Sequence, residues 1–218
     1  MTFFHTLPSG EISLRTPAPE KPAPLGVINL AKGSVIELAK QAVVTATVSW
    51  PPATDYDVYA IVAYRDGRQL VVSTFGTREQ PHDFTTATPD GAVRHLGDVQ
   101  RSSNASATET LEIRPNPDIV AIVPVVYSAQ SNGTGSFHRY KVSMRIDDGA
   151  GSTVVIDATT AERNDRIYTC VPGIVRVTAG GLSIENLELY SKPASEHRPV
   201  INSALQVDMD LGPVNAYK

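Results

Sequence analysis

Residues 43–64, VVTATVSWPPATDYDVYAIVAY, contain the clearest strand signals in the sequence. The first part of this stretch alternates apolar residues with threonine and serine as far as Trp50, which is typical of a strand with one buried face. Pro51 and Pro52 end that strand, because proline cannot donate a backbone hydrogen bond. The run VYAIVAY (58–64) then predicts a second, apolar strand. Two carboxylates, Asp55 and Asp57, stand at its start.

Turn residues separate further strand-like segments along the chain. Asp-Gly and Gly-Gly dipeptides favour tight hairpin turns, so hairpins are expected at 65–67, 147–151 and 179–181. GVINLAKGSVIEL (26–38) predicts another hairpin, with Lys32-Gly33 at its turn. The remaining expected strands are 92–98, 110–115, 119–127, 138–147, 152–158, 173–178 and 182–190.

Short strands between Gly, Pro and Asp turns, with almost no 3.6-residue periodicity, predict an all-β fold. We expect an antiparallel two-sheet β-sandwich over residues 26–192. The one expected helix is ATTAERNDRIYTC (158–170), which Thr160 could cap.

Two segments flank the expected domain. Residues 1–25 form a Pro-rich extended arm, since RTPAPEKPAP (15–24) contains four prolines that fix the backbone angle φ. Residues 193–218 form a polar, then moderately apolar tail. Such segments gain order only against a surface, so both could reach other proteins, including copies of this chain.

Composition excludes several classes of function. The 218 residues carry a formal charge of −4 and contain no clustered run of Lys and Arg, so no nucleic-acid partner is expected. The longest apolar run, IVAIVPVVY (119–127), is too short to cross a bilayer and is interrupted by Pro124. We expect a cytoplasmic protein without a signal sequence. The single cysteine, Cys170, is expected to be a buried apolar residue.

The acidic pair at the mouth of strand 58–64 suggests a cation site. Calcium prefers several carboxylate and carbonyl oxygens, and loops present them at alternate positions, as Asp55 and Asp57 stand. Asp98 ends one expected strand and Glu109 begins the next, so both could reach the same edge. The alternative is that each Asp forms a turn or bonds nearby backbone amides.

The ordered set of elements resembles the TerD family of tellurium-resistance and stress-response proteins over residues 25–190. The elements are Leu30 to Gly33, Trp50, Asp55 to Ala60, His95 to Asp98, and Glu109. The resemblance implies a two-sheet sandwich that binds calcium at one end through Asp55, Asp57, Asp98 and Glu109.

The chain departs from that family in the second acidic loop. Val99 replaces the usual Asn, Ala107 and Thr108 replace acids, and the loop RSSNASAT (101–108) carries Arg101 instead of carboxylates. Because the number of charged ligands tunes calcium affinity, these changes predict weaker binding.

Two functions remain open at this point. One is a TerD-like, calcium-linked binding protein of the stress or tellurite response, with peripheral membrane contact among its options. The other is a structural or decoration protein of a virion or another large assembly that uses the same sandwich. No catalytic motif is present, such as a nucleophile elbow, phosphate loop or zinc-protease helix, so we do not expect an enzyme.

Overall fold

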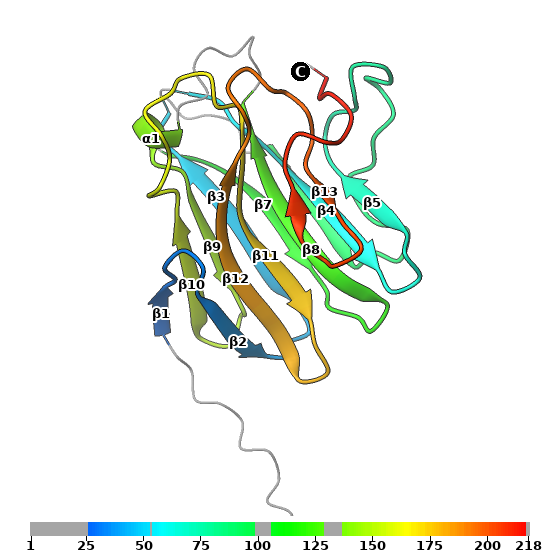
Figure 1. The fold of residues 1–218 in the computed structure, drawn as a ribbon. Coiled ribbons are helices and arrows are strands. Elements are labelled where there is room, and N and C mark those ends of the chain that lie inside the picture. The colour runs from blue at the N-terminus through cyan, green and yellow to red at the C-terminus, as the bar shows by residue number, and fades with distance from the viewer. Residues whose placement is uncertain (1–25, 53, 99–105, 129–136, 217–218) are drawn as a thin grey trace, which may run out of the picture.

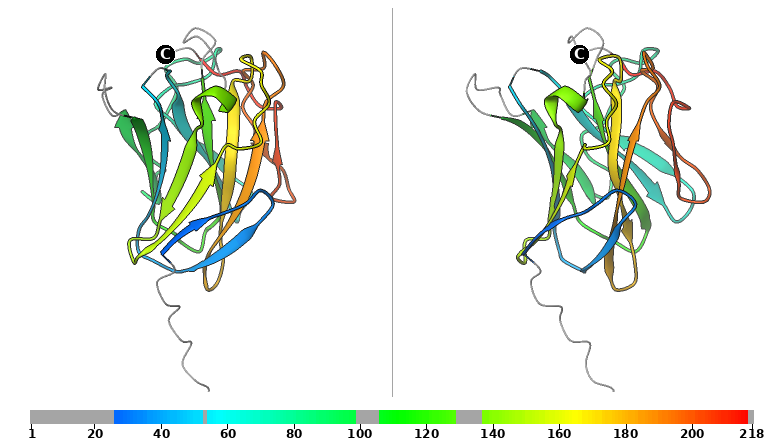
Figure 2. Two further views of the ribbon diagram at one scale, coloured as in Figure 1. Left: turned by 90° about the vertical axis from the view of Figure 1, so that its left-hand side faces the viewer. Right: turned by 60° about the vertical axis from the view of Figure 1, so that its left-hand side comes forward.

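Two six-stranded β-sheets face each other and form the sandwich that the sequence predicts (Figures 1 and 2). The computed structural model describes residues 26–52, 54–98, 106–128 and 137–216. The first sheet has the order β1 (Gly26–Asn29), β10 (Ser152–Asp157), β9 (Ser143–Asp147), β3 (Val44–Trp50), β7 (Ala107–Ile113) and β6 (Val93–Asp98). The second has the order β2 (Val35–Ala39), β12 (Gly181–Tyr190), β11 (Thr169–Val177), β8 (Ile119–Tyr127), β4 (Asp57–Tyr64) and β5 (Gln69–Val72).

The main core lies between the sheets and follows the period-2 pattern of the strands. In β3, Val44, Ala46, Val48 and Trp50 are buried, as their alternation predicts. Strand β4 is buried on both faces. Its even-numbered residues from Val58 onward join the core between the sheets, and its odd-numbered residues from Tyr59 onward pack in a second cluster on the outer face.

Three of the expected hairpins are confirmed, and one is wrong. Antiparallel pairs join β4 to β5, β9 to β10, and β11 to β12. Strands β1 and β2, however, do not pair: β1 lies parallel to β10 in the first sheet, and β2 pairs with β12 in the second. Lys32-Gly33 is therefore a crossing between sheets. A turn motif in the sequence predicts the local bend but not the strands with which the two flanking segments pair.

The expected helix at 158–170 is also wrong, since residues 158–168 form an irregular loop with one turn at 165–166, and Thr169 already begins β11. A buried side chain from β12 explains this. The Glu188 carboxylate accepts a hydrogen bond from the Thr160 amide at 2.7 Å and one from the Thr159 hydroxyl at 3.3 Å. This pairing holds the segment against β12, and tertiary contact overrides a weak helical tendency.

The expected strand at 138–147 is interrupted. A short helix, α1 (Phe137–Tyr140), comes first, and Lys141 follows it with φ at +46°. Strand β9 begins only at Ser143. Phe137 explains the helix, because its buried ring packs on Tyr56 at a centroid distance of 5.0 Å.

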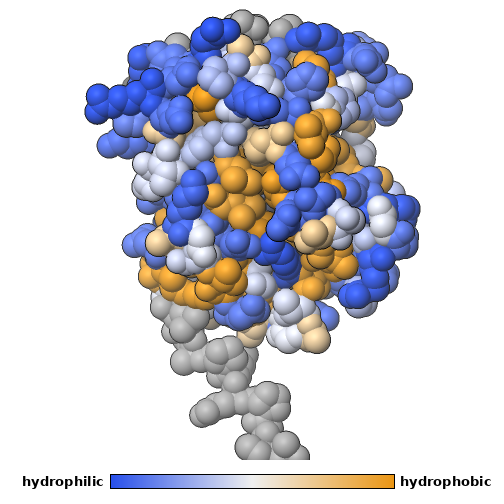
Figure 3. Space-filling view, viewed as in Figure 1, coloured by the Kyte–Doolittle hydropathy of each residue, from blue (hydrophilic) through white to orange (hydrophobic). Residues whose placement is uncertain are grey.

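The described part of the C-terminal tail packs on the second sheet of its own chain. It forms a small hairpin, β13 (Val200–Ile201) with β14 (Val207–Asp208), on the outer face of the second sheet (Figure 1). Arg198 anchors it: the buried guanidinium donates to the carbonyls of Phe75 and Gly76 at 3.2 and 2.8 Å and to Asn215 Oδ1 at 2.6 Å. Apolar surface stays visible beside this hairpin (Figure 3).

The arm at residues 1–25 and most of the loop at 101–108 lie outside the described residues. Within the part of the chain that the structure describes, no helix is long and apolar enough to span a membrane.

Candidate functional site at the acidic end of the sandwich

The buried carboxylate of Glu109 ties the two sheets together. Glu109 lies on β7 of the first sheet with 1% of its surface exposed. Its Oε2 accepts a hydrogen bond of 2.6 Å from the Val58 amide on β4 of the second sheet. Strand β5 pairs with β4 only from Ala60 to Ala63. The Glu109 carboxylate therefore binds the start of β4, which β5 does not reach. This bond places Glu109 one residue from Asp57.

His95 is a second partner of the same carboxylate. Its side chain is fully buried on β6, and its Nε2 lies 3.2 Å from Glu109 Oε2. Its Nδ1 accepts the Gly97 amide hydrogen at 3.0 Å. Because Nδ1 is an acceptor, the neutral ring carries its proton on Nε2, which then donates to Glu109. The buried ring of His95 thus links the Gly97 amide to the Glu109 carboxylate.

A β-bulge at Gly97 sets the position of Asp98. His95 pairs with Leu111 and Asp98 with Glu109, so three steps on β6 match two on β7. Gly97 adopts φ of +93°, which L side chains rarely tolerate, and this explains the glycine in His-Leu-Gly-Asp. The bulge puts Asp98 directly opposite Glu109 in the register. The side chain of Asp98 lies outside the described part of the structure.

Asp55 and Asp57 flank a rigid aromatic anchor. Tyr56 is fully buried, with Trp50 at 5.7 Å and Phe137 at 5.0 Å between ring centroids. Asp55 is half-buried, and Asp57 is 4% exposed at the start of β4. Strand alternation puts Asp57 on the side of Tyr59, opposite the inward side of Val58. Asp57 and Glu109 thus lie at one end of the sandwich, but Asp57 belongs to the outer side of its sheet.

The donor set supports a hard cation only in part. Calcium takes about six to eight oxygen ligands. Among the described residues, no group of three or more His, Cys, Asp and Glu side chains is arranged to hold a metal ion. Thr54, just before Asp55, adds a buried hydroxyl that has no hydrogen-bond partner among the described residues. A complete calcium shell would also need oxygens from Asp98 and the 99–105 loop.

Lys32 and Gly33, which belong to the elements that resemble the TerD family, form hydrogen bonds with β12. The Gly33 amide donates to the Asn186 carbonyl at 2.8 Å, and Lys32 Nζ donates to the Glu188 carbonyl at 3.1 Å. Glu188 itself is buried and has φ of +41°, which is rare for a residue with a side chain. Burial raises the pKa of its carboxyl, but hydrogen bonds from Thr160 and its neighbours outweigh this, so the pKa lies below its usual range.

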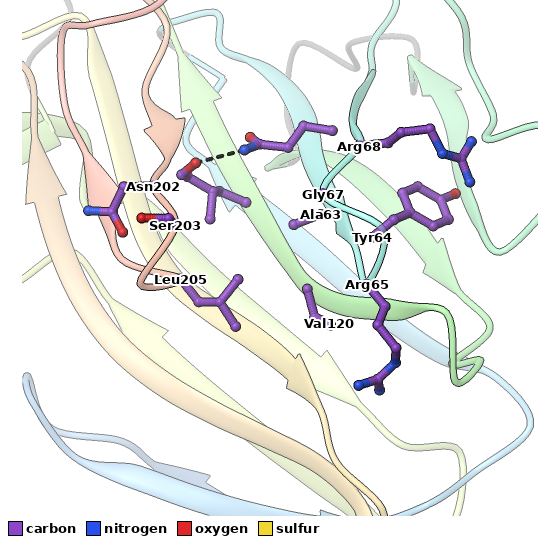
Figure 4. Close-up of a pocket in the computed structure, with 11 residues that line it drawn as sticks. Ala63, Tyr64, Arg65, Gly67, Arg68, Val120, Asn202, Ser203 and Leu205 are labelled. Atoms are coloured by element: carbon purple, nitrogen blue, oxygen red, sulfur yellow. Dashed lines mark hydrogen bonds between the residues drawn. The ribbon is translucent and has the colours of Figure 1, made fainter.

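Two of the residues that line one cavity on the outer face are arginines, but their charged groups do not point into it. It has a volume of about 550 Å³ and lies between the β4–β5 and β13–β14 hairpins, which Gln69 Nε2 joins by a 2.7 Å bond to the Ile201 carbonyl (Figure 4). The side chains of Arg65 and Arg68 point away from Val120 and Leu205, and Arg68 pairs with a neighbouring carboxylate at 2.7 Å. We assign no site there.

Cys170 is buried inside β11 as predicted, and burial raises the pKa of its thiol. It therefore remains a protonated, inaccessible apolar residue.

Comparisons with known proteins support the fold and go no further. No family model and no curated protein matches the chain. A solved structure of an unknown function protein, SAV2460, is similar to it with a TM-score of 0.50 and 16% sequence identity, and the match covers 71% of this chain and 93% of that chain. At this identity the similarity shows the fold alone. The chain is thus a two-sheet β-sandwich shared with a protein of unknown function.

Proposed function

We propose that this protein is a TerD-like, non-enzymatic binding protein whose acidic end takes a divalent cation, with calcium the expected ion, in a stress or tellurite response. The observation that carries the proposal is the buried Glu109 carboxylate on the Val58 amide. It brings a charged group from the first sheet to the strand that Asp57 begins.

The chemistry of the end supports a hard ion. Asp55, Asp57 and Glu109 are oxygen donors, and the register puts Asp98 opposite Glu109. Carboxylates at directly opposite positions of a sheet repel each other, and a bound cation would offset that repulsion. The buried Thr54 hydroxyl adds a neutral oxygen beside Asp55. These residues could hold the ion, which would supply a rigid link between the loops.

The small number of free carboxylate oxygens at this end implies a modest affinity for calcium. Glu109 Oε2 already accepts two hydrogen bonds, and the loop 99–105 contains Gln, Ser and Asn oxygens but no carboxylate. Fewer charged ligands give dissociation constants toward the upper end of the calcium range, about 10⁻⁴ to 10⁻³ M.

A thermal-shift titration tests the cation. Calcium at about tenfold above its dissociation constant should stabilise the fold by about 1.4 kcal/mol, which raises Tm by about 3–6 °C. Asp57→Asn should abolish the rise relative to EDTA. The matched control is Asp83→Asn, since Asp83 is exposed on another loop and its side chain makes no hydrogen bond in the described structure. An equal rise in both variants, or no rise at millimolar calcium, would contradict the proposal.

The positions of the reactive side chains support a non-enzymatic function. The His95 and Glu109 side chains are 0% and 1% exposed, and Cys170 is likewise enclosed. A substrate would have to open the sandwich to reach them. Activity would therefore require groups other than these three.

The second candidate is a structural component of a large assembly, and one surface favours it. Val27 on β1 and Val35 on β2 are 62% and 54% exposed, and both lie on edge strands. Figure 3 shows hydrophobic surface at the lower left, the corner where Figure 1 places β1. Open edges and exposed apolar side chains are typical of association surfaces. The tail gives no such support, because it packs on its own sheet. Sedimentation of the purified chain, with Val27→Lys as the variant, separates the two candidates.

A further inference from the structure

Basic side chains from two separate segments of the chain gather around one cavity beside α1. The cavity has a volume of about 530 Å³ and is lined by His138, Arg139, Lys141, Arg163 and Asp165. The first three come from α1 and the residue after it, and the last two from the irregular loop at 158–168. The segment expected to be a helix at 158–170 instead forms a loop that faces α1 across this cavity. Figure 3 shows hydrophilic side chains over the corner that α1 occupies.

The charge around this cavity is unbalanced. Three permanent cations and one carboxylate leave a local charge of +2, with His138 taken as neutral, on a chain of formal charge −4. Arg139 pairs with Asp165 at 3.0 Å. The side chains of Lys141 and Arg163 make no hydrogen bond or ion pair within the described residues, and both are exposed. Two cations are therefore available to a ligand.

The backbone beneath these cations is anchored. The buried Phe137 ring contacts Tyr56 and Tyr190 at 5.0 and 5.9 Å between centroids. Lys141 closes α1 through a bond of 3.1 Å from its amide to the Phe137 carbonyl, in the left-handed conformation at φ +46°. Such a conformation in a residue with a side chain is an unusual feature that often accompanies a functional position. Here it directs the chain from α1 into β9.

We propose that this cavity binds a phosphoryl group or a similar multivalent oxyanion. A guanidinium presents paired donors that match phosphate oxygens, and an ammonium adds a compact charge beside it. The volume lies within the range of small-ligand sites. The cations surround one cavity rather than form a stripe, which fits a single anionic group better than a nucleic-acid backbone. The phosphoryl group can be soluble or part of a lipid headgroup.

This site is independent of the cation proposed above. It uses none of Asp55, Asp57, Asp98 or Glu109, so it is tested in EDTA. Its structural link to the acidic end is Tyr56, which stands between Asp55 and Asp57 and packs on Phe137.

The experiment is calorimetric titration of the full chain with inorganic pyrophosphate, followed by flotation with vesicles. The vesicles contain either neutral phosphatidylcholine alone or added phosphatidylinositol phosphate. We expect saturable binding that weakens with salt, and at least tenfold weaker binding by the double variant Lys141→Gln with Arg163→Gln. The matched control, Lys40→Gln with Arg145→Gln, removes the same charge from exposed positions elsewhere and should bind as the wild type does.

Each outcome of the titration and the flotation either supports or overturns the proposed oxyanion site. Pyrophosphate binding without flotation identifies a soluble ligand, and flotation that requires the phosphorylated lipid identifies a headgroup; the double variant must weaken whichever is seen. Equal loss in the double variant and its control would mean a general charge effect and would overturn the proposal. Absence of both pyrophosphate binding and flotation would also overturn it, whatever the calcium titration shows.

Discussion

Arg198 offers the sharpest test of how the tail belongs to the fold. The perturbation is Arg198→Met, which keeps the length of the side chain and removes its donors. Arg198 is 6% exposed, and its guanidinium lies 5.1 and 5.5 Å from the ring centroids of Tyr59 and Phe75. Burial lowers the pKa of this guanidinium, but its ordinary pKa is so high that it stays charged.

The magnitude follows from the three hydrogen bonds to Phe75, Gly76 and Asn215. Bonds that involve a charged group contribute about 1.5–3 kcal/mol each. Because the methionine recovers part of the packing and each carbonyl keeps a second lone pair, we expect a total loss of about 3–5 kcal/mol. For a domain of this size, Tm should fall by about 6–20 °C.

The assay combines urea unfolding with hydrogen exchange of residues 199–214. Arg198→Met should speed exchange there, because the β13–β14 hairpin loses its anchor. Arg166→Met is the matched control, since the Arg166 side chain is exposed and makes no hydrogen bond in the described structure, and should change stability by less than about 0.5 kcal/mol. A loss below about 1 kcal/mol with unchanged exchange would mean that Arg198 does not anchor the tail.

Two further predictions concern buried carboxylates. Glu109→Ala leaves two buried donors without their acceptor and should lower the free energy of unfolding in urea by about 2–4 kcal/mol. The control Glu112→Ala, at the solvent-facing side of the same strand, should lower it by less than about 1 kcal/mol. Similar urea midpoints for the two variants would contradict this prediction. Glu188 has a lowered pKa, so its stabilising effect is present above its unfolded pKa, near about 4.3, and is lost as pH falls through the folded pKa. Glu188→Gln should therefore be less stable at neutral pH and lose less stability on acidification; a parallel pH profile would contradict the account.

The class of the fold could be predicted from the amino-acid sequence alone. Alternation in β3, the Pro-Pro stop after Trp50 and the Asp-Gly turn before β5 are local signals, because side chains of a strand alternate and turn residues need particular backbone angles. The sequence also singled out the end of the sandwich where Asp57, Asp98 and Glu109 stand.

The pairing of the strands and the contacts of the loops could not be predicted in this way and became visible in the folded structure. The Lys32-Gly33 turn crosses between sheets, Glu188 prevents a helix at 158–170, and the tail closes over its own sheet. Lys141 and Arg163, far apart in the chain, meet at one cavity. Each depends on contacts between distant residues, which local propensity does not encode. The acidic pair Asp55 and Asp57 was visible from the start; its relation to Glu109 through the Val58 amide was not.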